Sequence, residues 1–422
     1  MSKKIFIVSP VSLRKVNGQL GLDEQTCEKL VRWTESFEQV VFACTVLPQQ
    51  VTPSSSETWR AIDDLPCRDR IEFVLLPYAY RIQDFIRTYR KTRQLLRAKI
   101  RESQYLCFSP CVLVGDWSGI ACLEAMKLNR PYAVSTDRVE YQVIWRTLNS
   151  YPLKHRIKEL LLLPLMQPYL KFLIQRSRLG LFQGQECYEV FSQFCNNAHC
   201  VYDVHTRKED QISRDRLSNK IDQLVQGQPL KIGYVGRASE MKGGLDWIRV
   251  IYRLYEAGVK VNATWLGDGE LLPQMKQLAA DLGIRDCIHF EGFVGDRQKI
   301  LKILRQQHLF LFCHKTPESP RCLIEALVSG CPIVGYDSSY PRGLVAAQGG
   351  GLFSPINDEV TLTRHIIQLN VDRSRLCLLV QEAARTGQRF DEETVFHHRS
   401  GLIKKHLPAK PDSVISIAPY SC

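Results

Sequence analysis

The sequence predicts an α/β protein with two lobes, each built on a parallel β-sheet covered by helices. The chain has 422 residues, which a typical domain size of about 150 residues divides into roughly two to three domains. Hydrophobic residues make up 45% of it and charged residues 24%, as in folded globular proteins. Short apolar runs alternate with longer amphipathic stretches in both halves, and this alternation is typical of right-handed βαβ units.

The first half begins with a strand pattern. The N-terminal sequence MSKKIFIVSPVSL is interrupted by Ser9 and Pro10 too early for a secretory signal peptide, so KIFIVSP predicts the first strand. Further apolar runs predict buried strands: QVVFACTVLP, IEFVLLP, YLCFSPCVLVG and RPYAVST. The stretches 23–37, 82–102 and 118–128 predict the helices between them. No run reaches the roughly 20 uncharged apolar residues of a membrane span, so we expect a cytoplasmic protein.

The second half follows a polar segment. Residues 207–229 contain few apolar side chains, close on a Gly-Gln-Pro turn and predict a linker. Strand and helix patterns then resume with KIGYVG and continue to PIVGY. The sequence therefore predicts an N-terminal domain of residues 1–206, the linker, a C-terminal domain of residues 230–390 and a terminal segment, 391–422.

Cysteine usage and charge limit the classes of function. The 15 cysteines include no C-x-x-C pair, so we expect reduced, mostly buried thiols and no metal site. The formal net charge of +12 fits three partners: nucleic acid, an anionic membrane surface or a phosphorylated substrate. No helix-turn-helix, zinc-finger or aromatic RNA-binding pattern is present, so we do not expect nucleic acid binding.

The loop after KIGYVG is the first candidate ligand site. Its sequence GRASEMKGG places Gly236 at a tight turn and Arg237 and Lys242 beside the start of the next helix. Cations and the N–H groups of a helix N-terminus attract anions, so this loop is a candidate diphosphate cradle. The alternative is two exposed basic residues near a turn.

The segment HKTPESPRCLIEALVSG, residues 314–330, is the second candidate. Ser319 fits an N-cap and Pro320 the first helical position, which predicts a helix from Pro320. Glu318 and Glu325 then stand on either side of the helix start, where carboxylates can accept hydrogen bonds from sugar or ribose hydroxyls. The alternative is that Glu318 favours the helix dipole and Glu325 is an ordinary surface residue.

The order and spacing of GRASEMKGG, GDG, HFEGFV and ESPRCLIEALVSGCPIVGYD resemble glycosyltransferase family 4, the large retaining family with the GT-B fold. The resemblance covers most of residues 230–407 and is mainly architectural in the first half. It implies two Rossmann-like, doubly wound domains that face a cleft. It also implies that the helix from about Glu393 to His406 crosses back to the N-terminal domain.

The resemblance assigns roles to individual residues. Arg237 and Lys242 would bind the donor diphosphate, Glu318 the donor sugar hydroxyls and Glu325 the ribose. The backbone near Phe293 and Val294 would meet the base. The predicted donor-binding set also includes Gly236, Ser319 and Arg321. Here the two glutamates stand seven positions apart, one fewer than in the family, and Ser-Pro-Arg replaces the usual Gly-Phe-Gly.

The same resemblance assigns the acceptor to the N-terminal domain. The sequence VNGQLG is similar to the family's glycine loop after the first strand, so Gly18 and Gly21 would approach the donor phosphate unless this is a plain glycine loop. Asp137, after RPYAVST, would align the acceptor hydroxyl as a catalytic residue, or it caps a helix. Asp116 and Trp117 are weaker candidates for the same region.

Two basic stretches account for much of the positive charge. Residues 152–178 combine a leucine-rich row with Lys154, His155, Arg156, Lys158, Lys171, Arg176 and Arg178. Such a helix can lie on an anionic membrane, or it packs on the first lobe with a solvated basic edge. A second basic stretch, 87–101, lies in the same lobe.

Together these features predict a retaining, metal-independent glycosyltransferase with catalytic residues Asp137, Arg237, Lys242 and Glu318. No cofactor is expected, and a nucleotide-diphosphate sugar serves as co-substrate. The acceptor hydroxyl stays open among polysaccharides, lipid-linked sugars and small glycosides. The alternatives are a GT-B nucleotide-sugar epimerase and a non-catalytic nucleotide-sugar-binding relative.

Overall fold

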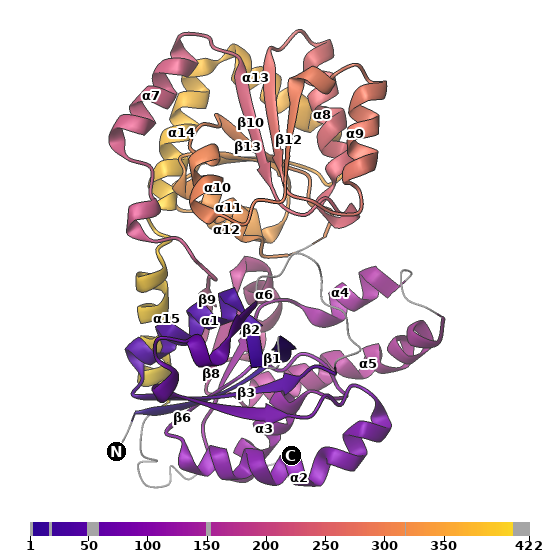
Figure 1. Ribbon diagram of the computed structural model, residues 1–422, viewed down its shortest axis with the longest axis vertical. Helices are drawn as coiled ribbons and strands as arrows, with labels where there is room; N and C mark the ends of the chain where they lie inside the picture. The colour runs from indigo at the N-terminus through magenta and orange to yellow at the C-terminus, as the bar shows by residue number, and fades with distance from the viewer. Residues whose placement is uncertain (1–2, 17–18, 49–58, 149–152, 317, 408–422) are drawn as a thin grey trace. The chain divides into compact units, whose positions relative to one another are not determined.

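A computed structural model of the protein describes residues 3–16, 19–48, 59–148, 153–316 and 318–407 (Figure 1). The chain divides into two compact units. The N-terminal unit comprises residues 1–183, 187–201 and 396–422, and the C-terminal unit comprises residues 184–186 and 202–395. Each unit is an α/β layer structure around its own sheet.

The sheet of the N-terminal unit has seven parallel strands in the order β5-β3-β1-β6-β7-β8-β9. Strand β2 pairs antiparallel with the carboxyl end of β1, and β4 pairs antiparallel with β2. Along β1, Ile5 and Ile7 face one apolar core and Phe6 and Val8 the other. This alternation shows a sheet that is buried on both faces. The strands are β1 Lys4–Val16, β2 Gln19–Asp23, β3 Gln39–Val46, β4 Trp59–Ala61, β5 Ile71–Leu76, β6 Tyr105–Phe108, β7 Ala133–Thr136, β8 Leu179–Gln183 and β9 Ala198–Val201.

The helices of the N-terminal unit include one from the far end of the chain. The last helix enters this unit at Phe396, whose ring lies 5.8 Å from that of Trp33, and Ile403 is fully buried. The chain thus returns to the unit where it began. The helices are α1 Glu24–Ser36, α2 Ile82–Glu102, α3 Trp117–Lys127, α4 Glu140–Thr147, α5 Leu153–Gln175, α6 Gly184–Phe191, of which the first turn groups with the other unit, and α15 Glu392–His406.

The sheet of the C-terminal unit is wholly parallel, with the order β12-β11-β10-β13-β14-β15. From β10 the chain adds β11 and then β12 on one side of the sheet. It then returns to β13, beside β10, and adds β14 and β15 on the other side. Ligands of open α/β sheets bind at the carboxyl ends of the strands where the order reverses, which here is between β10 and β13. The strands are β10 Leu230–Val235, β11 Val261–Leu266, β12 Ile288–Gly292, β13 Leu309–Phe312, β14 Ile333–Tyr336 and β15 Gly351–Ser354.

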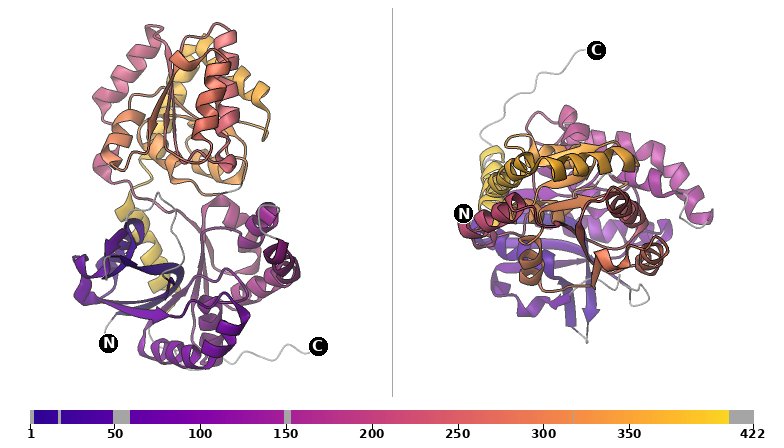
Figure 2. Two further views of the ribbon diagram at one scale, coloured as in Figure 1. Left: turned by 45° about the vertical axis from the view of Figure 1, so that its right-hand side comes forward. Right: turned by 90° about the horizontal axis from the view of Figure 1, so that it is seen from above.

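Helices cover this sheet in two groups (Figures 1 and 2). Helix α8 packs against α9 and α13, and α14 packs against α7, α11 and α12. The helices are α7 Arg214–Val225, α8 Gly244–Glu256, α9 Leu272–Asp281, α10 Arg297–Leu304, α11 Arg321–Val328, α12 Ser339–Val345, α13 Glu359–Val371 and α14 Arg373–Gly387.

The segment predicted as a linker differs from that expectation. Within residues 207–229, α7 forms a helix that packs on α14 inside the C-terminal unit. Its Leu224 is fully buried, and Lys220 is only 3% exposed. Most other α7 side chains are polar and exposed, so composition alone does not distinguish this helix from a linker.

Candidate functional site

The candidate site lies at the reversal of strand order in the C-terminal unit. Strands β10 and β13 are parallel neighbours, so the loops that follow them, residues 236–243 and 313–320, meet at one edge of the sheet. These are the two loops that the sequence singles out. Residue 317 lies outside the described residues.

The two loops are held together through their backbones. The N–H of Lys315 donates to the carbonyl of Met241 over 2.9 Å. Gly243 has φ +64°, and a Cβ built on it would overlap the carbonyl oxygen of Cys313. Only glycine fits this backbone conformation and this close approach, so the turn before α8 depends on Gly243.

Lys242 and Glu318 meet across the two loops. Lys242 Nζ lies 2.5 Å from Glu318 Oε1, and both side chains are partly buried. The same carboxylate oxygen lies 3.4 Å from His314 Nδ1, and His314 Nε2 lies 2.8 Å from the hydroxyl of Tyr234. The family resemblance assigns Lys242 and Glu318 to neighbouring parts of one donor, the diphosphate and the sugar. The structure brings the two side chains into contact.

His314 is held neutral in this arrangement. Its side chain is buried, and burial, followed by the positive charge of Lys242, lowers its pKa well below the ordinary value. A neutral imidazole can accept a hydrogen bond from the Tyr234 hydroxyl at Nε2. This contact directs Nδ1 toward Glu318. Sequence reasoning missed both residues, because neither belongs to a charged pattern and their contact needs β10 and β13 to be adjacent.

Glu325 has separate partners. It lies in the second turn of α11, and its Oε1 is 4.0 Å from Arg297 Nε at the start of α10. Arg297 in turn lies 3.5 Å from the carboxylate of Asp210, which also accepts from the side-chain amide of Gln298 at 2.9 Å. Glu318 and Glu325 thus do not form a touching pair, as the sequence predicts.

The other predicted donor-site residues lie at the same edge. Gly236 and Arg237 follow β10, and the Arg237 side chain is exposed. Phe293 and Val294 follow β12, and the Phe293 ring is 59% exposed. The structure brings these residues to the carboxyl end of one sheet.

The start of α11 corrects a prediction. The helix begins at Arg321 rather than Pro320, and Pro320, with extended backbone at ψ 121°, takes the N-cap position without a side-chain hydrogen bond. Ser319 is therefore not the N-cap. Ser319 and Arg321 flank this proline at the end of the loop that carries Glu318.

In the N-terminal unit, Gly18 lies outside the described residues. Gly21 corrects another prediction, since it does not lie in a loop. It sits inside β2, paired with Arg14 of β1 and Ala61 of β4. A glycine inside a strand produces the same sequence pattern here as a glycine in a phosphate-approaching loop.

Asp137 is exposed directly after β7, at the carboxyl end of that strand. It does not cap α4, which begins at Glu140 with Val139 at the N-cap and no side-chain hydrogen bond. Asp116 is the N-cap of α3 and accepts from the N–H groups of Ser118 and Cys111 at 2.9 Å each. Asp116 thus has a structural role, and burial raises its pKa to about 6.

Residues 215–386 match the family model described as glycosyl transferases group 1. These residues form a group 1 glycosyltransferase domain. The domain includes the loops 236–243 and 313–320. Its match begins inside the predicted linker, in agreement with the packing of α7.

Curated relatives match less than half of the chain. The amylovoran biosynthesis glycosyltransferase AmsK of Erwinia amylovora is 25% identical over 185 residues, or 42% of this chain and 45% of AmsK. The lipopolysaccharide core biosynthesis glycosyltransferase LpsE of Rhizobium meliloti is 29% identical over 164 residues, or 38% of this chain and 46% of LpsE. The chain thus spans less than half the length of these relatives.

Solved structures match nearly the whole chain. Anabaena HepE, crystallised in complex with UDP, superimposes with a TM-score of 0.64 at 14% identity, and the match covers 96% of this chain and 100% of HepE. At this identity the similarity concerns the fold. The prediction of a GT-B fold is confirmed.

Proposed function

We propose that the protein is a retaining glycosyltransferase of family 4 that moves a sugar from a nucleotide-diphosphate sugar to a hydroxyl acceptor. One observation carries this proposal: the loops after β10 and β13 bring Lys242 and Glu318 into contact. Glu325 follows in the second turn of α11. A cation for phosphate and carboxylates for hydroxyls thus stand together at the switch point of a group 1 domain.

Arg237 and Lys242 bind the donor diphosphate in this proposal. As the bond between sugar and diphosphate breaks, negative charge grows on the leaving phosphate, and fixed cations stabilise that charge. Lys242 suits this role because its contact with Glu318 holds its long side chain at the loop junction. Gly236, Ser319 and Arg321 complete the phosphate-binding edge.

The glutamates bind hydroxyl groups on either side of the diphosphate. Glu318 Oε1 faces Lys242 and His314, which leaves Oε2 to accept from a hydroxyl of the donor sugar. Glu325, steadied by Arg297, accepts from the ribose. Phe293 and Val294 lie where a base would follow the ribose, and Asp137 aligns the acceptor hydroxyl.

HepE binds UDP and, in another structure, UDP-glucose, so a UDP-sugar is the first donor to test. AmsK and LpsE are glycosyltransferases of amylovoran and lipopolysaccharide core biosynthesis, which supports a growing saccharide as acceptor. Polysaccharide biosynthesis is therefore the role that we propose.

A panel of nucleotides tests the function. We expect the full chain to be stabilised against heat by one of UDP, GDP or ADP and by its sugars, because a ligand of the native state raises apparent stability. Glu325→Gln should weaken nucleotide binding about tenfold or more, since a hydrogen bond to a charged group contributes about 1.5–3 kcal/mol.

Each outcome of the panel discriminates between functions. No thermal shift with any nucleotide would rule out both the transferase and an epimerase. A shift without sugar transfer or hydrolysis would favour a non-catalytic relative, which the shortened spacing between Glu318 and Glu325 makes the natural second candidate. Release of an altered free sugar would identify an epimerase.

The proposal includes peripheral contact with an anionic membrane through α5. No helix among the described residues is long and apolar enough to cross a membrane. Helix α5 carries two apolar faces. Leu163, Met166, Leu170 and Leu173 are buried against the unit.

The other face of α5 is exposed. Leu153, Ile157, Leu161 and Leu165 recur every four residues and are each at least 51% exposed. Trp145 of the neighbouring α4 is 65% exposed. Lys158 Nζ donates to the carbonyl of Tyr80 at 3.3 Å, which places the start of α2, with its exposed Ile82 and Ile86, beside α5.

Cations flank this apolar surface. Lys171 near the end of α5 and Arg176 directly after it are exposed, as are Arg87, Arg90 and Lys91 in the first half of α2. An exposed apolar row beside basic side chains is typical of helices that lie in the interface of an anionic leaflet. This surface supports the membrane contact.

A further inference from the structure

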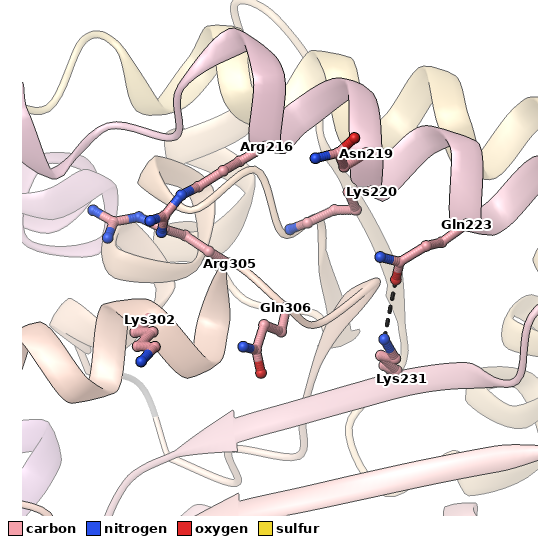
Figure 3. A pocket seen from close by; sticks show the side chains of 8 residues that line it. All are labelled: Arg216, Asn219, Lys220, Gln223, Lys231, Lys302, Arg305 and Gln306. Carbon is pink, nitrogen blue, oxygen red and sulfur yellow. Dashed lines mark hydrogen bonds between the residues drawn. The ribbon is translucent and has the colours of Figure 1, made fainter.

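A basic cavity lies at the opposite edge of the C-terminal sheet from the proposed donor site. Lys231 is the second residue of β10, and Arg305 and Gln306 precede β13, so the cavity lies at the amino ends of these strands (Figure 3). At about 3.3 Å per residue, β10 separates it from Gly236 by roughly 15 Å. Its volume is about 240 Å³.

Five cations line this cavity. They come from three elements: Arg216 and Lys220 from α7, Lys231 from β10, and Lys302 and Arg305 from the end of α10 and the turn after it. The remaining lining side chains are amides, and among the residues that the structure describes no carboxylate lines the cavity. In the close-up, side chains from α7 and from the α10 region face one another across it (Figure 3).

Three of these cations donate hydrogen bonds to neutral acceptors. Lys220 donates to the carbonyls of Ser329 and Gly330 at 2.9 and 3.0 Å, and Lys231 donates to the amide oxygen of Gln223 at 3.0 Å. Arg305 donates to the backbone carbonyl of Asp210 at 2.6 Å. All these acceptors are neutral. Elsewhere in the unit, by contrast, Arg249 lies within 3.0 Å of two carboxylates.

The pKa values of Lys220, Arg305 and His308 reflect burial among these positive charges. Burial, with a smaller contribution from the charge of Arg305, lowers the pKa of Lys220 to about 8. Burial and then the charge of Arg216 lower the pKa of Arg305, while the carboxylate of Asp210 acts in the opposite direction. His308, beside the cavity, has a pKa of about 3 because of burial and then the charges of Lys231 and Lys220. An anion in the cavity would relieve these repulsions.

We infer that this cavity is a binding site for a small multivalent oxyanion of the phosphate class, such as diphosphate or a sugar phosphate. Two guanidinium groups can each bind an oxyanion with two parallel hydrogen bonds, and the lysines add point charges. The volume lies below the roughly 300–1,000 Å³ of pockets for drug-sized ligands, so a compact ion fits best. The site is separate from the donor site, and the inference does not depend on the proposed transferase activity.

Occupancy should be detectable as thermal stabilisation. Lys220 joins α7 to the end of α11 through the carbonyls of Ser329 and Gly330. An anion that offsets the cost of burying the charged Lys220 would therefore strengthen a contact between two packed elements. Ligand binding to the native state raises apparent stability by mass action.

The test titrates pyrophosphate into the full chain at constant ionic strength and measures both the thermal shift and the heat of binding. Because the donor site also attracts a diphosphate, the titration is repeated in the Arg237→Gln/Lys242→Gln variant. Arg216→Gln/Lys302→Gln removes two exposed cavity cations without disturbing the buried Lys220. Lys260→Gln, at an exposed position of the same unit outside the cavity, controls for lost net charge.

We expect saturable binding that persists in Arg237→Gln/Lys242→Gln and in Lys260→Gln and weakens at least tenfold in Arg216→Gln/Lys302→Gln. Equal binding in the cavity variant, or no saturable response in the donor-site variant, would overturn the inference. A parallel arm measures sedimentation with vesicles that contain phosphatidic acid. If the cavity variant loses vesicle binding and pyrophosphate does not bind, the site would recognise a lipid headgroup, and the soluble-ligand inference would be wrong.

Discussion

At the scale of single residues, opposite charges serve different parts of one proposed ligand. The chain is basic overall, yet Glu318 and Glu325 both stand at the loop junction of the group 1 domain, and each has a cationic neighbour. Lys242 contacts the Glu318 carboxylate at 2.5 Å, and Arg297 lies 4.0 Å from that of Glu325. The glutamates differ in surroundings, because Glu318 lies beside the buried His314 and Tyr234, whereas Glu325 lies beside Arg297 at the start of α10.

Glu318→Gln should separate catalysis from binding. The substitution keeps the size of the side chain but removes the charge that holds Lys242 and accepts a sugar hydroxyl. We expect sugar transfer to slow by about tenfold to a hundredfold, in line with a charged hydrogen bond of about 1.5–3 kcal/mol, while affinity for the nucleotide alone changes little. Initial rates and nucleotide titrations measure the two effects. A variant with full transfer activity would remove Glu318 from the proposed mechanism.

Asp116 should make stability depend on pH. Its pKa is raised from 3.8 to about 6 in the folded protein, so the fold binds its proton more tightly than the unfolded chain does. Its contribution to stability is therefore fully present below pH 3.8 and is lost as pH rises to about 6. The loss should amount to about 3 kcal/mol at most.

Urea denaturation of the wild type and Asp116→Asn across this range tests the prediction. Asparagine does not titrate, so the variant should lack the fall in unfolding free energy between pH 4 and 6 even if its absolute stability is lower. Parallel pH profiles for the two proteins would show that Asp116 is ionised throughout.

At the scale of elements, the sequence predicted the strands and helices that position the site, with errors at particular residues. Short apolar runs identified β10 and β13, and the Ser319–Pro320 helix-start pattern identified α11. The start of α11 was misplaced because Ser319 and Pro320 fit the helix-start pattern, whereas Pro320 takes an extended conformation. Contacts such as Tyr234–His314 could not be predicted, since they depend on which strands are neighbours.

Gly243→Ala should show how strongly the loop junction depends on glycine. The positive φ costs an alanine about 1–2 kcal/mol, and its Cβ would also overlap the Cys313 carbonyl. We expect a loss of about 3 kcal/mol or more in unfolding free energy. Gly283→Ala is the matched control, with φ +69° but open space around the Cβ, and should lose only the conformational cost. Equal losses in urea denaturation would mean that the contact with Cys313 relaxes freely.

At the scale of the whole molecule, net charge alone did not identify a partner, but the structure shows where the charge lies. Basic side chains of α2 and α5 adjoin exposed apolar rows in the N-terminal unit, and a separate group lines the cavity of the C-terminal unit. The sequence left open whether the leucines of α5 are core or surface. They are both, because Leu161 and Leu165 are exposed whereas Leu163 and Leu170 are buried on another side of the same helix.

Membrane binding should depend on the exposed row of α5. Leu161→Ser/Leu165→Ser removes two apolar side chains that are 70% and 59% exposed, so the fold should be little affected. Burying a leucine stabilises by about 1.5–3 kcal/mol, so sedimentation with anionic vesicles should weaken at least about tenfold. Added salt should weaken it further by screening the cations. Val371→Ser/Leu378→Ser, at exposed positions of the C-terminal unit, controls for lost hydrophobicity, and an equal loss in both variants would argue against α5.

The return of α15 to the N-terminal unit has a consequence for biosynthesis. Residues 202–395 supply nearly all of the C-terminal unit, so that unit can fold once they have emerged during translation. The N-terminal unit, although it is synthesised first, still lacks Phe396, Leu402 and Ile403, which belong to its buried core. Until residues 396–407 have been synthesised, an apolar face beside Trp33 stays exposed to water. The half of the protein that is made first is thus completed last, and a fragment of residues 1–201 should aggregate where residues 202–395 stay in solution.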